Sequence, residues 1–158
     1  MSKNVGDKAV ELFASGYNCS ESVLLALTRE FNKPTDRTIS SIATGFGGGI
    51  ARTGSTCGTL TGATMAIGLI VGRNKPDEQE KRDTVYEMAS KMIMEFEKEF
   101  GTSLCKDLTK CDLRTHEGYE KFKSQKIRET VCPKFVRWAA NHATRLAKTG
   151  KTSITYRV

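Results

Sequence analysis

The sequence has no long hydrophobic run. Its longest apolar stretch, residues 63–71, is interrupted by Thr64 and Gly68 and is much shorter than the ~20 residues that a membrane-spanning helix needs. Residues 1–6 lack the apolar segment of a signal peptide. We therefore expect no membrane insertion and no export, and we predict a cytoplasmic protein.

Motifs for nucleotide and haem binding are also missing. The glycine-rich segment 45–50 fails the dinucleotide pattern G-x-G-x-x-G because Ile50 stands at its third glycine. Residues 150–152 end like a phosphate-binding loop, but Arg145 stands where that loop requires its first glycine. The five cysteines include no C-x-x-C pair, which excludes attachment of haem c and a local zinc knuckle. We expect no nucleotide and no haem c.

Acidic residues are scarce toward the C-terminus. Residues 1–100 carry 12 Lys and Arg against 13 Asp and Glu, whereas residues 101–158 carry 13 against 5. Such a basic segment can attract nucleic acid or an acidic protein. The lysines of residues 119–128 are spaced as on a solvated amphipathic helix, and no nucleic-acid-binding motif accompanies them. We expect no nucleic acid, and we keep a non-catalytic helical adaptor with a basic C-terminal third as one alternative function.

Helical periodicity recurs along the chain. In residues 77–100, apolar side chains recur at steps of three and four, with Glu and Lys on the opposite face. Pro76 before this segment and Gly101 after it are typical start and stop signals of a helix. No segment alternates apolar and polar residues for long enough to form a sheet. These patterns predict an all-α fold.

The predicted fold is a single compact bundle of about seven or eight helices within residues 1–149. A glycine-rich loop at residues 45–54 precedes its central apolar helix. The predicted helices cover residues 5–14, 20–31, 36–44, 57–71, 77–100, 104–109, 117–130 and 133–148. Residues 150–158 form a C-terminal tail that is either extended or loose.

Four of the five cysteines stand at predicted helix starts, whereas Cys111 falls in a loop. The four are Cys19, Cys57, Cys105 and Cys132. Asn18 is an N-cap candidate with Glu21 three residues later, and Pro133 is a residue favoured at the first helical position. The separations of 38, 48 and 27 residues are too long for a local metal site. Only the tertiary fold can bring these cysteines together.

The position of these four cysteines at helix starts should affect the pKa values of their thiols. Unpaired N–H groups and the positive end of the helix dipole favour a thiolate over a thiol, so we expect lowered cysteine pKa values. Thiolates are nucleophiles and ligands of soft metals. The alternative interpretation is that these cysteines only pack in helical cores, as cysteine often does.

The chain resembles the C_GCAxxG_C_C family of redox-active proteins over roughly residues 9–140. The resemblance is carried by GYNCSESV at 16–23, FGGG at 46–49, CGTLTGA at 57–63, FG at 100–101, CKDL at 105–108 and CPKFV at 132–136. Thr59 stands where the family usually has alanine, and Cys111 is an additional cysteine. The resemblance implies a helical fold, redox or metal chemistry, and Cys19, Cys57, Cys105 and Cys132 as the characteristic cysteines.

Five glycines accompany the predicted site. They are Gly47, Gly48 and Gly49 in the loop and Gly58 and Gly62 on the central helix. Glycine permits positive φ and close backbone approach. Two explanations remain open, namely close helix packing and room for a cofactor or a second sulfur.

We predict that Cys19, Cys57, Cys105 and Cys132 bind an iron–sulfur cluster or zinc, both of which accept four cysteine ligands. The expected function is electron transfer with a redox protein partner or an oxidoreductase. The second hypothesis is a metal-free thiol–disulfide oxidoreductase, with Cys57 as the attacking thiolate and Cys19 as the second candidate catalytic residue.

Overall fold

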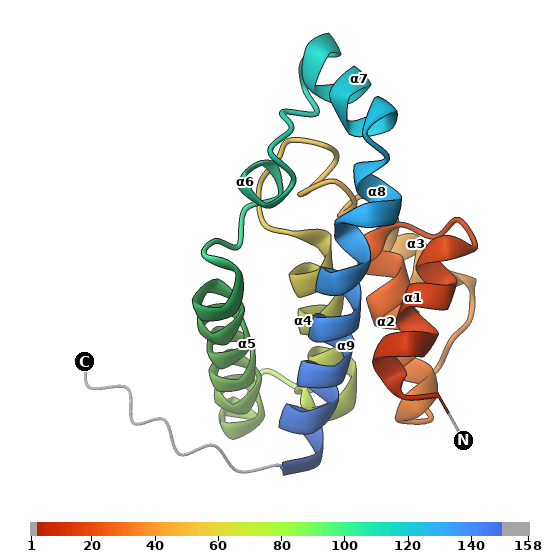
Figure 1. Cartoon of the computed structure of the whole chain (residues 1–158). Coiled ribbons are helices and arrows are strands. Elements are labelled where there is room, and N and C mark those ends of the chain that lie inside the picture. Colours follow the sequence, from red (N-terminus) through yellow and green to blue (C-terminus); the bar gives the residue numbers. More distant parts are fainter. Residues whose placement is uncertain (1–2, 150–158) are drawn as a thin grey trace.

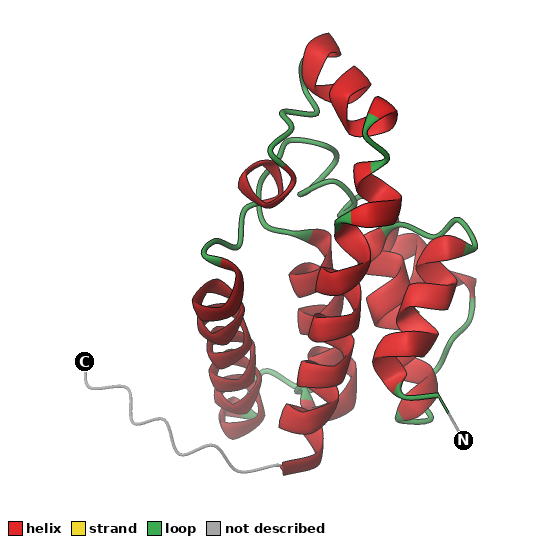
Figure 2. Ribbon diagram, viewed as in Figure 1, coloured by secondary structure: helices red, strands yellow, loops and turns green. Residues whose placement is uncertain are grey.

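The computed structural model describes residues 3–149, and this part of the chain consists of helices joined by loops (Figure 2). Within it there is no strand, only an isolated antiparallel bridge between Thr56 and Leu104. The all-α prediction is confirmed. The predicted tail, residues 150–158, lies outside the described residues. None of the helices in the described part is long and apolar enough to cross a membrane.

The predicted helices are present with small shifts at their ends (Figure 1). They are α1 (Val5–Ala14), α2 (Cys19–Glu30), α3 (Arg37–Thr44), α4 (Gly58–Val71), α5 (Gln79–Phe100), α6 (Cys105–Thr109), α7 (His116–Ser124), α8 (Ile127–Thr130) and α9 (Cys132–Thr149). The single helix predicted over residues 117–130 is wrong, because the chain breaks into α7 and α8 there. Lys126 adopts a left-handed conformation with φ +51°, which interrupts the helical path.

Local signals set several helix ends. The Asn18 side chain accepts a hydrogen bond from the Glu21 backbone N–H, and the Glu21 carboxylate accepts one from the Asn18 N–H, which completes the predicted capping box. Gly101 ends α5 with φ +85°, a conformation in which glycine carries no steric cost. These caps fix where α2 begins and where α5 stops.

Helix α4 lies at the centre of the bundle and packs against α2, α5 and α9, while α1 covers α2 and α9 (Figure 1). Its central residues, among them Leu60, Ala63 and Ile67, are fully buried. Gly62 allows the close approach of α2, because a Cβ atom at Gly62 would lie 2.3 Å from the Ser20 carbonyl oxygen. The prediction of a central apolar helix is confirmed.

An aromatic cluster joins α5 to α9. Phe96 is fully buried, and its ring centroid lies 4.7 Å from Phe100, 5.8 Å from Phe135 and 5.3 Å from Trp138. Tilted and edge-to-face rings at such distances attract one another beyond the effect of burial. On the other side of Trp138, the buried His142 ring stacks at 4.1 Å. The aromatic cluster therefore holds the N-terminal half of α9 against α5.

We predict that Phe96→Ala destabilises the protein by about 3–5 kcal/mol, because it leaves a cavity at the centre of this cluster. The exposed Met94 on the same helix provides the control, and Met94→Ala should change the free energy of unfolding by no more than about 0.5 kcal/mol. Urea unfolding followed by circular dichroism measures both. Equal effects of the two variants would contradict the central position of Phe96.

Candidate thiol site

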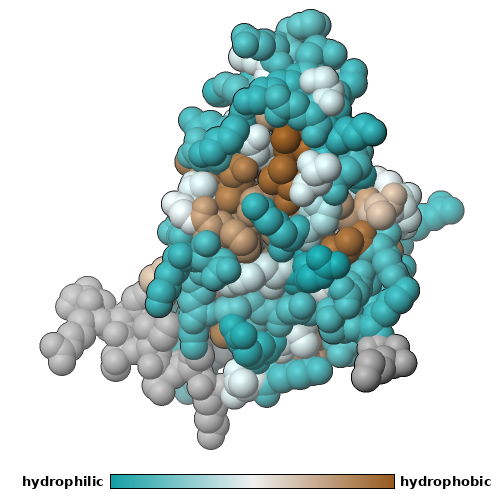
Figure 3. Space-filling view, viewed as in Figure 1, coloured by the Kyte–Doolittle hydropathy of each residue, from teal (hydrophilic) through white to brown (hydrophobic). Residues whose placement is uncertain are grey.

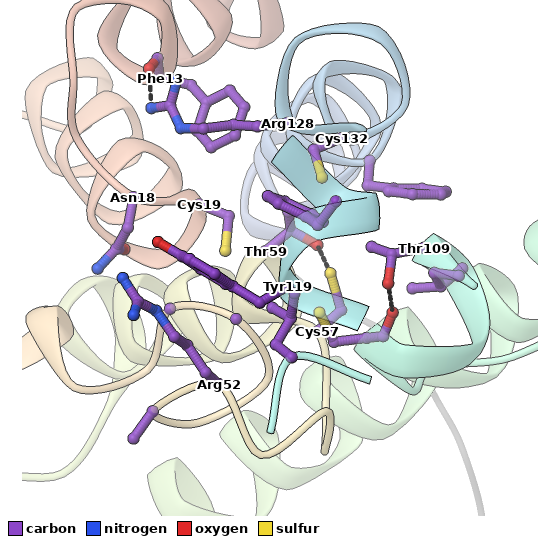
Figure 4. Close-up of a pocket in the computed structure, with 18 of the residues that line it drawn as sticks. Phe13, Asn18, Cys19, Arg52, Cys57, Thr59, Thr109, Tyr119, Arg128 and Cys132 are labelled. Atoms are coloured by element: carbon purple, nitrogen blue, oxygen red, sulfur yellow. Dashed lines mark hydrogen bonds between the residues drawn. The ribbon is translucent and has the colours of Figure 1, made fainter. Parts of the chain in front are cut away.

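The four cysteines at helix starts line one cavity of about 690 Å³ (Figure 4). They come from α2, the residue before α4, α6 and α9, so the fold brings together segments far apart in the sequence. Cys57 and Cys105 are buried, while Cys19 and Cys132 are partly exposed. Cys111 is buried but does not line the cavity. The structure therefore agrees with a shared site for Cys19, Cys57, Cys105 and Cys132.

A short antiparallel pairing places Cys57 beside Cys105. The Cys57 N–H donates to the Ser103 carbonyl at 2.8 Å, and the Cys105 N–H donates to the Ser55 carbonyl at 2.8 Å. In such a pairing Cys57 and Cys105 are diagonal neighbours on the same face, because they flank the bridged residues Thr56 and Leu104. The first turns of α4 and α6 thus hold their sulfurs on one wall of the cavity.

Cys19 lies where the start of α2 meets the start of α4. A Cβ atom at Gly58 would lie 2.4 Å from the Cys19 sulfur and 2.8 Å from the Phe46 carbonyl oxygen. The nearby backbone N–H groups of Ser20, Gly48 and Gly58 act to lower the pKa of the Cys19 thiol. Only glycine at position 58 leaves space for this sulfur.

Cys132 opens α9, the helix that also carries the aromatic cluster. Just before it, the Arg128 guanidinium donates to the carbonyl of Phe13 at 2.6 Å and to that of Tyr17 at 3.1 Å. The same guanidinium lies 4.2 Å from the Phe13 ring centroid. Arg128 thereby fastens the α8–α9 segment to α1 and keeps Cys132 facing the cavity (Figure 4).

The five glycines singled out in the sequence have different structural roles. Gly47 and Gly48 line the cavity, and a Cβ atom at Gly49 would lie 2.6 Å from the Cys105 Cβ atom. Gly58 makes room for the Cys19 sulfur, whereas Gly62 contacts only the backbone of Ser20 and serves helix packing. Close helix packing therefore explains Gly62, and room for a second sulfur explains Gly58.

The expectation of lowered cysteine pKa values is wrong for the protein with free thiols. Burial raises the pKa of Cys105 and of Cys132 to about 12 in each case, and the nearby Cys19 thiolate adds to both. Burial also raises the pKa of Cys57, assisted by the charges of Cys19 and Cys105. The pKa of Cys19 is likewise raised by burial, although the surrounding backbone N–H groups work in the opposite direction. Desolvation outweighs the helix ends because the sulfurs lie beneath the surface.

The four cysteines line the cavity, but their side chains are not grouped as the ligands of a single metal ion. Within residues 3–149, no three Cys, His, Asp or Glu side chains lie close enough together to hold a single metal ion. The Cys57 sulfur lies 3.2 Å from the Thr59 hydroxyl, the residue that replaces the usual alanine. The donor set is therefore four soft sulfurs that line one cavity, and burial raises the pKa of each of the four thiols.

The mouth of the cavity contains residues that the sequence did not single out. Arg52 stacks on the Tyr119 ring at 5.1 Å from its centroid, and Lys123 approaches the same ring at 5.3 Å. These contacts join the glycine-rich loop to α7, which is distant in sequence (Figure 4). A lone arginine in a loop carries no periodic signal, so Arg52 could not be predicted from local sequence patterns.

The loop that carries Arg52 has an unusual backbone. Gly48, Gly49, Ile50, Ala51 and Arg52 all have φ between +51° and +69°. Residues other than glycine occupy this region at a cost of roughly 1–2 kcal/mol each. Strain of this kind persists only where the surrounding structure imposes it, and it concentrates at functional sites.

Comparison with known proteins places this arrangement in context. The family described as "Putative redox-active protein (C_GCAxxG_C_C)" matches residues 17–146. An "Uncharacterized protein" of Archaeoglobus fulgidus is 28% identical over 107 residues, which cover 64% of this chain and 71% of the relative. No solved structure matches the chain.

We predict that Gly58→Ala destabilises the protein by about 1–3 kcal/mol, because the added methyl group overlaps the Cys19 sulfur. Gly68 on the same helix is the matched control. It has no neighbour within 4 Å of an added Cβ atom, so Gly68→Ala should stabilise the protein by up to about 1 kcal/mol. Chemical unfolding of the reduced protein distinguishes the two. A stabilising Gly58→Ala would show that the sulfur does not occupy this space.

The free energy of unfolding should also depend on pH in the alkaline range. The unfolded chain ionises its thiols near the ordinary pKa of 9.0, whereas the folded protein holds the protons of Cys105 and Cys132 up to a pKa of about 12. The folded state therefore binds more protons between these values, and the free energy of unfolding should fall as pH rises from 9 toward 12. Replacing both residues by alanine should make this fall shallower in urea titrations between pH 8 and 10.5. An unchanged slope would show that the two thiols ionise as freely as in the unfolded chain.

Proposed function

The chain belongs to the C_GCAxxG_C_C family, and from this premise we propose that it is a redox protein whose four cavity cysteines bind a polynuclear iron–sulfur cluster. The observation that carries the proposal is that Cys19, Cys57, Cys105 and Cys132 line a single cavity. When bound, the cluster supplies one-electron transfer. The protein residues hold it and shield it from water.

The donor chemistry suits iron–sulfur ligation better than zinc. A single zinc ion binds four thiolates at about 2.3 Å, which brings the sulfurs to within roughly 4 Å of one another. No such convergence occurs in the described part of the chain. A cluster of several iron and sulfide atoms has its cysteine ligands farther apart, around its corners. A cavity with sulfurs on its walls fits the larger group.

Proton release accompanies this binding. Burial keeps the thiols of Cys57, Cys105 and Cys132 protonated in the free protein. Each must lose its proton to become a ligand, so assembly is favoured by high pH. The N–H groups of Ser20, Gly48 and Gly58 lie near the Cys19 sulfur, lower its pKa and would stabilise its negative charge. Free thiols are also the state that a reducing cytoplasm maintains, and we place the protein there.

The metal-free thiol–disulfide oxidoreductase is the second candidate. Cys19 and Cys132 are partly exposed in the cavity, where a small disulfide could reach them. Two thiols would then give two electrons and two protons to that disulfide and become a disulfide themselves. The raised pKa of Cys57 disfavours Cys57 as the attacking thiolate. In this case a redox partner would be a small thiol pool and not an electron-transfer protein.

Anaerobic reconstitution with iron and sulfide tests the first candidate. We expect visible absorption with stoichiometric iron in the parent protein, and loss of most of both in alanine variants of Cys19, Cys57, Cys105 or Cys132. Cys111 offers a control, because it is a buried thiol that lies outside the cavity, so Cys111→Ala should retain the iron. Reconstitution in weakly buffered solution should release about one proton per protonated ligand thiol.

Two results would contradict the cluster. One is iron binding that survives any of the four replacements. The other is a parent protein that binds no iron but gives a reversible two-electron titration in the presence of chelators, which would establish the second candidate.

A further inference from the structure

We propose that the cavity also binds a small organic anion, whose charged group lies at the mouth beside Arg52 and Lys123 and whose apolar body lies against the aromatic walls. This inference rests on the proposed function and deepens it, because it names a class of ligand that the cavity of the cysteine site would bind. The binding itself requires only the folded chain.

The cavity is larger than the space that the four sulfur atoms occupy. Pockets for small organic ligands usually enclose roughly 300–1,000 Å³, and the cavity measures about 690 Å³. Besides the thiols, its lining includes the rings of Phe13, Tyr119, Phe122 and Phe135. On the surface, hydrophobic residues gather where α6, α8 and α9 meet, enclosed by hydrophilic ones (Figure 3). Such walls favour a ligand with an apolar body.

The charged side chains that line the cavity favour an anionic ligand. Among residues 3–149 no ion pair involves Arg52, whose guanidinium stacks on Tyr119. Arg128 donates to backbone carbonyls, so its positive charge is also not neutralised by a carboxylate there. The Lys123 ammonium forms a salt bridge with the Glu120 carboxylate, with 3.3 Å between Nζ and Oε1. Glu129 is the acidic residue of the cavity lining. The guanidinium of Arg52 is a planar donor suited to a carboxylate, sulfonate or phosphate.

The backbone supports the same assignment. Arg52 ends the run of five residues with positive φ, and the run is closed by hydrogen bonds from Arg52 N–H to Gly47 O and from Ser55 N–H to Gly49 O. An ordinary turn would not need Ile50 and Ala51 in this conformation. Both ends of the strained turn line the cavity, Arg52 at one end and Gly48 at the other, and Cys19 lines the same cavity. One loop therefore connects the anion at the mouth with the sulfurs below.

Calorimetric titration of the reduced protein with naphthoate tests the proposal, with naphthylmethanol as the neutral probe of similar shape. We expect one naphthoate per chain and at least about tenfold weaker binding of the alcohol. Arg52→Gln should weaken naphthoate binding about tenfold or more and leave the alcohol unaffected. The exposed Arg37 on α3 lies away from the cavity, so Arg37→Gln is the control with the same change of charge.

Alkylation locates the bound probe. Naphthoate should slow the reaction of Cys19 and Cys132 with iodoacetamide in the parent protein, and not in Arg52→Gln. The proposal is overturned by equal affinity for the two probes, by equal binding in Arg52→Gln and Arg37→Gln, by the absence of binding, or by thiols that naphthoate leaves unprotected.

Reconstitution of the same variants separates this inference from the proposed function. Arg52→Gln that assembles the iron–sulfur cluster but binds naphthoate weakly supports both proposals. A parent protein that binds naphthoate without assembling a cluster overturns only the proposed cofactor. A parent protein that assembles the cluster and ignores naphthoate overturns only the anion site.

Discussion

Burial of four sulfur atoms from four separate segments is the constraint on which this structure depends. Each sulfur needs space at a place where two helices or a helix and a loop are already in contact. The chain provides it by omitting side chains, as at Gly58, where any Cβ atom would overlap the Cys19 sulfur. It also aligns two segments through paired backbone hydrogen bonds between Ser55–Cys57 and Ser103–Cys105. Packing and chemistry are therefore determined by the same contacts.

The electrostatic consequence is a site that is neutral when empty of ligands and ready to become charged. Thiols in a poorly solvated cavity keep their protons because the loss of hydration outweighs the effect of nearby positive charge, as at Cys132, where Arg128 lowers the pKa less than burial raises it. Helix starts and backbone N–H groups reduce this cost most around Cys19 and little around Cys105 and Cys132. A cofactor that brings positive charge would change this balance for all four sulfurs together. For the proposed cluster, binding, proton release and stability would be linked in one equilibrium.

The glycine-rich loop connects the interior of this site with its opening. Its glycines approach Cys105 and Asn18 too closely for other residues, and its strained end holds Arg52 against Tyr119. The aromatic cluster supports the opposite wall, because Phe135 belongs both to the cluster and to the cavity lining. A change in the hydrophobic core between α5 and α9 can therefore reach the cysteine site through Phe135.

The sequence alone determined what depends on neighbouring residues. Apolar periodicity predicted the helices, the Asn18–Glu21 pair predicted the start of α2, and the common position at helix starts singled out the four cysteines that line the cavity. The split between α7 and α8 escaped it, because the left-handed backbone at Lys126 has no local signature. Only the tertiary structure decided that the four sulfurs share a cavity, that burial raises their pKa values, and that Arg52 stands at the mouth. Dehydration of a thiol and stacking of a cation on a ring depend on what surrounds them in space, and residues far apart in the chain supply those surroundings.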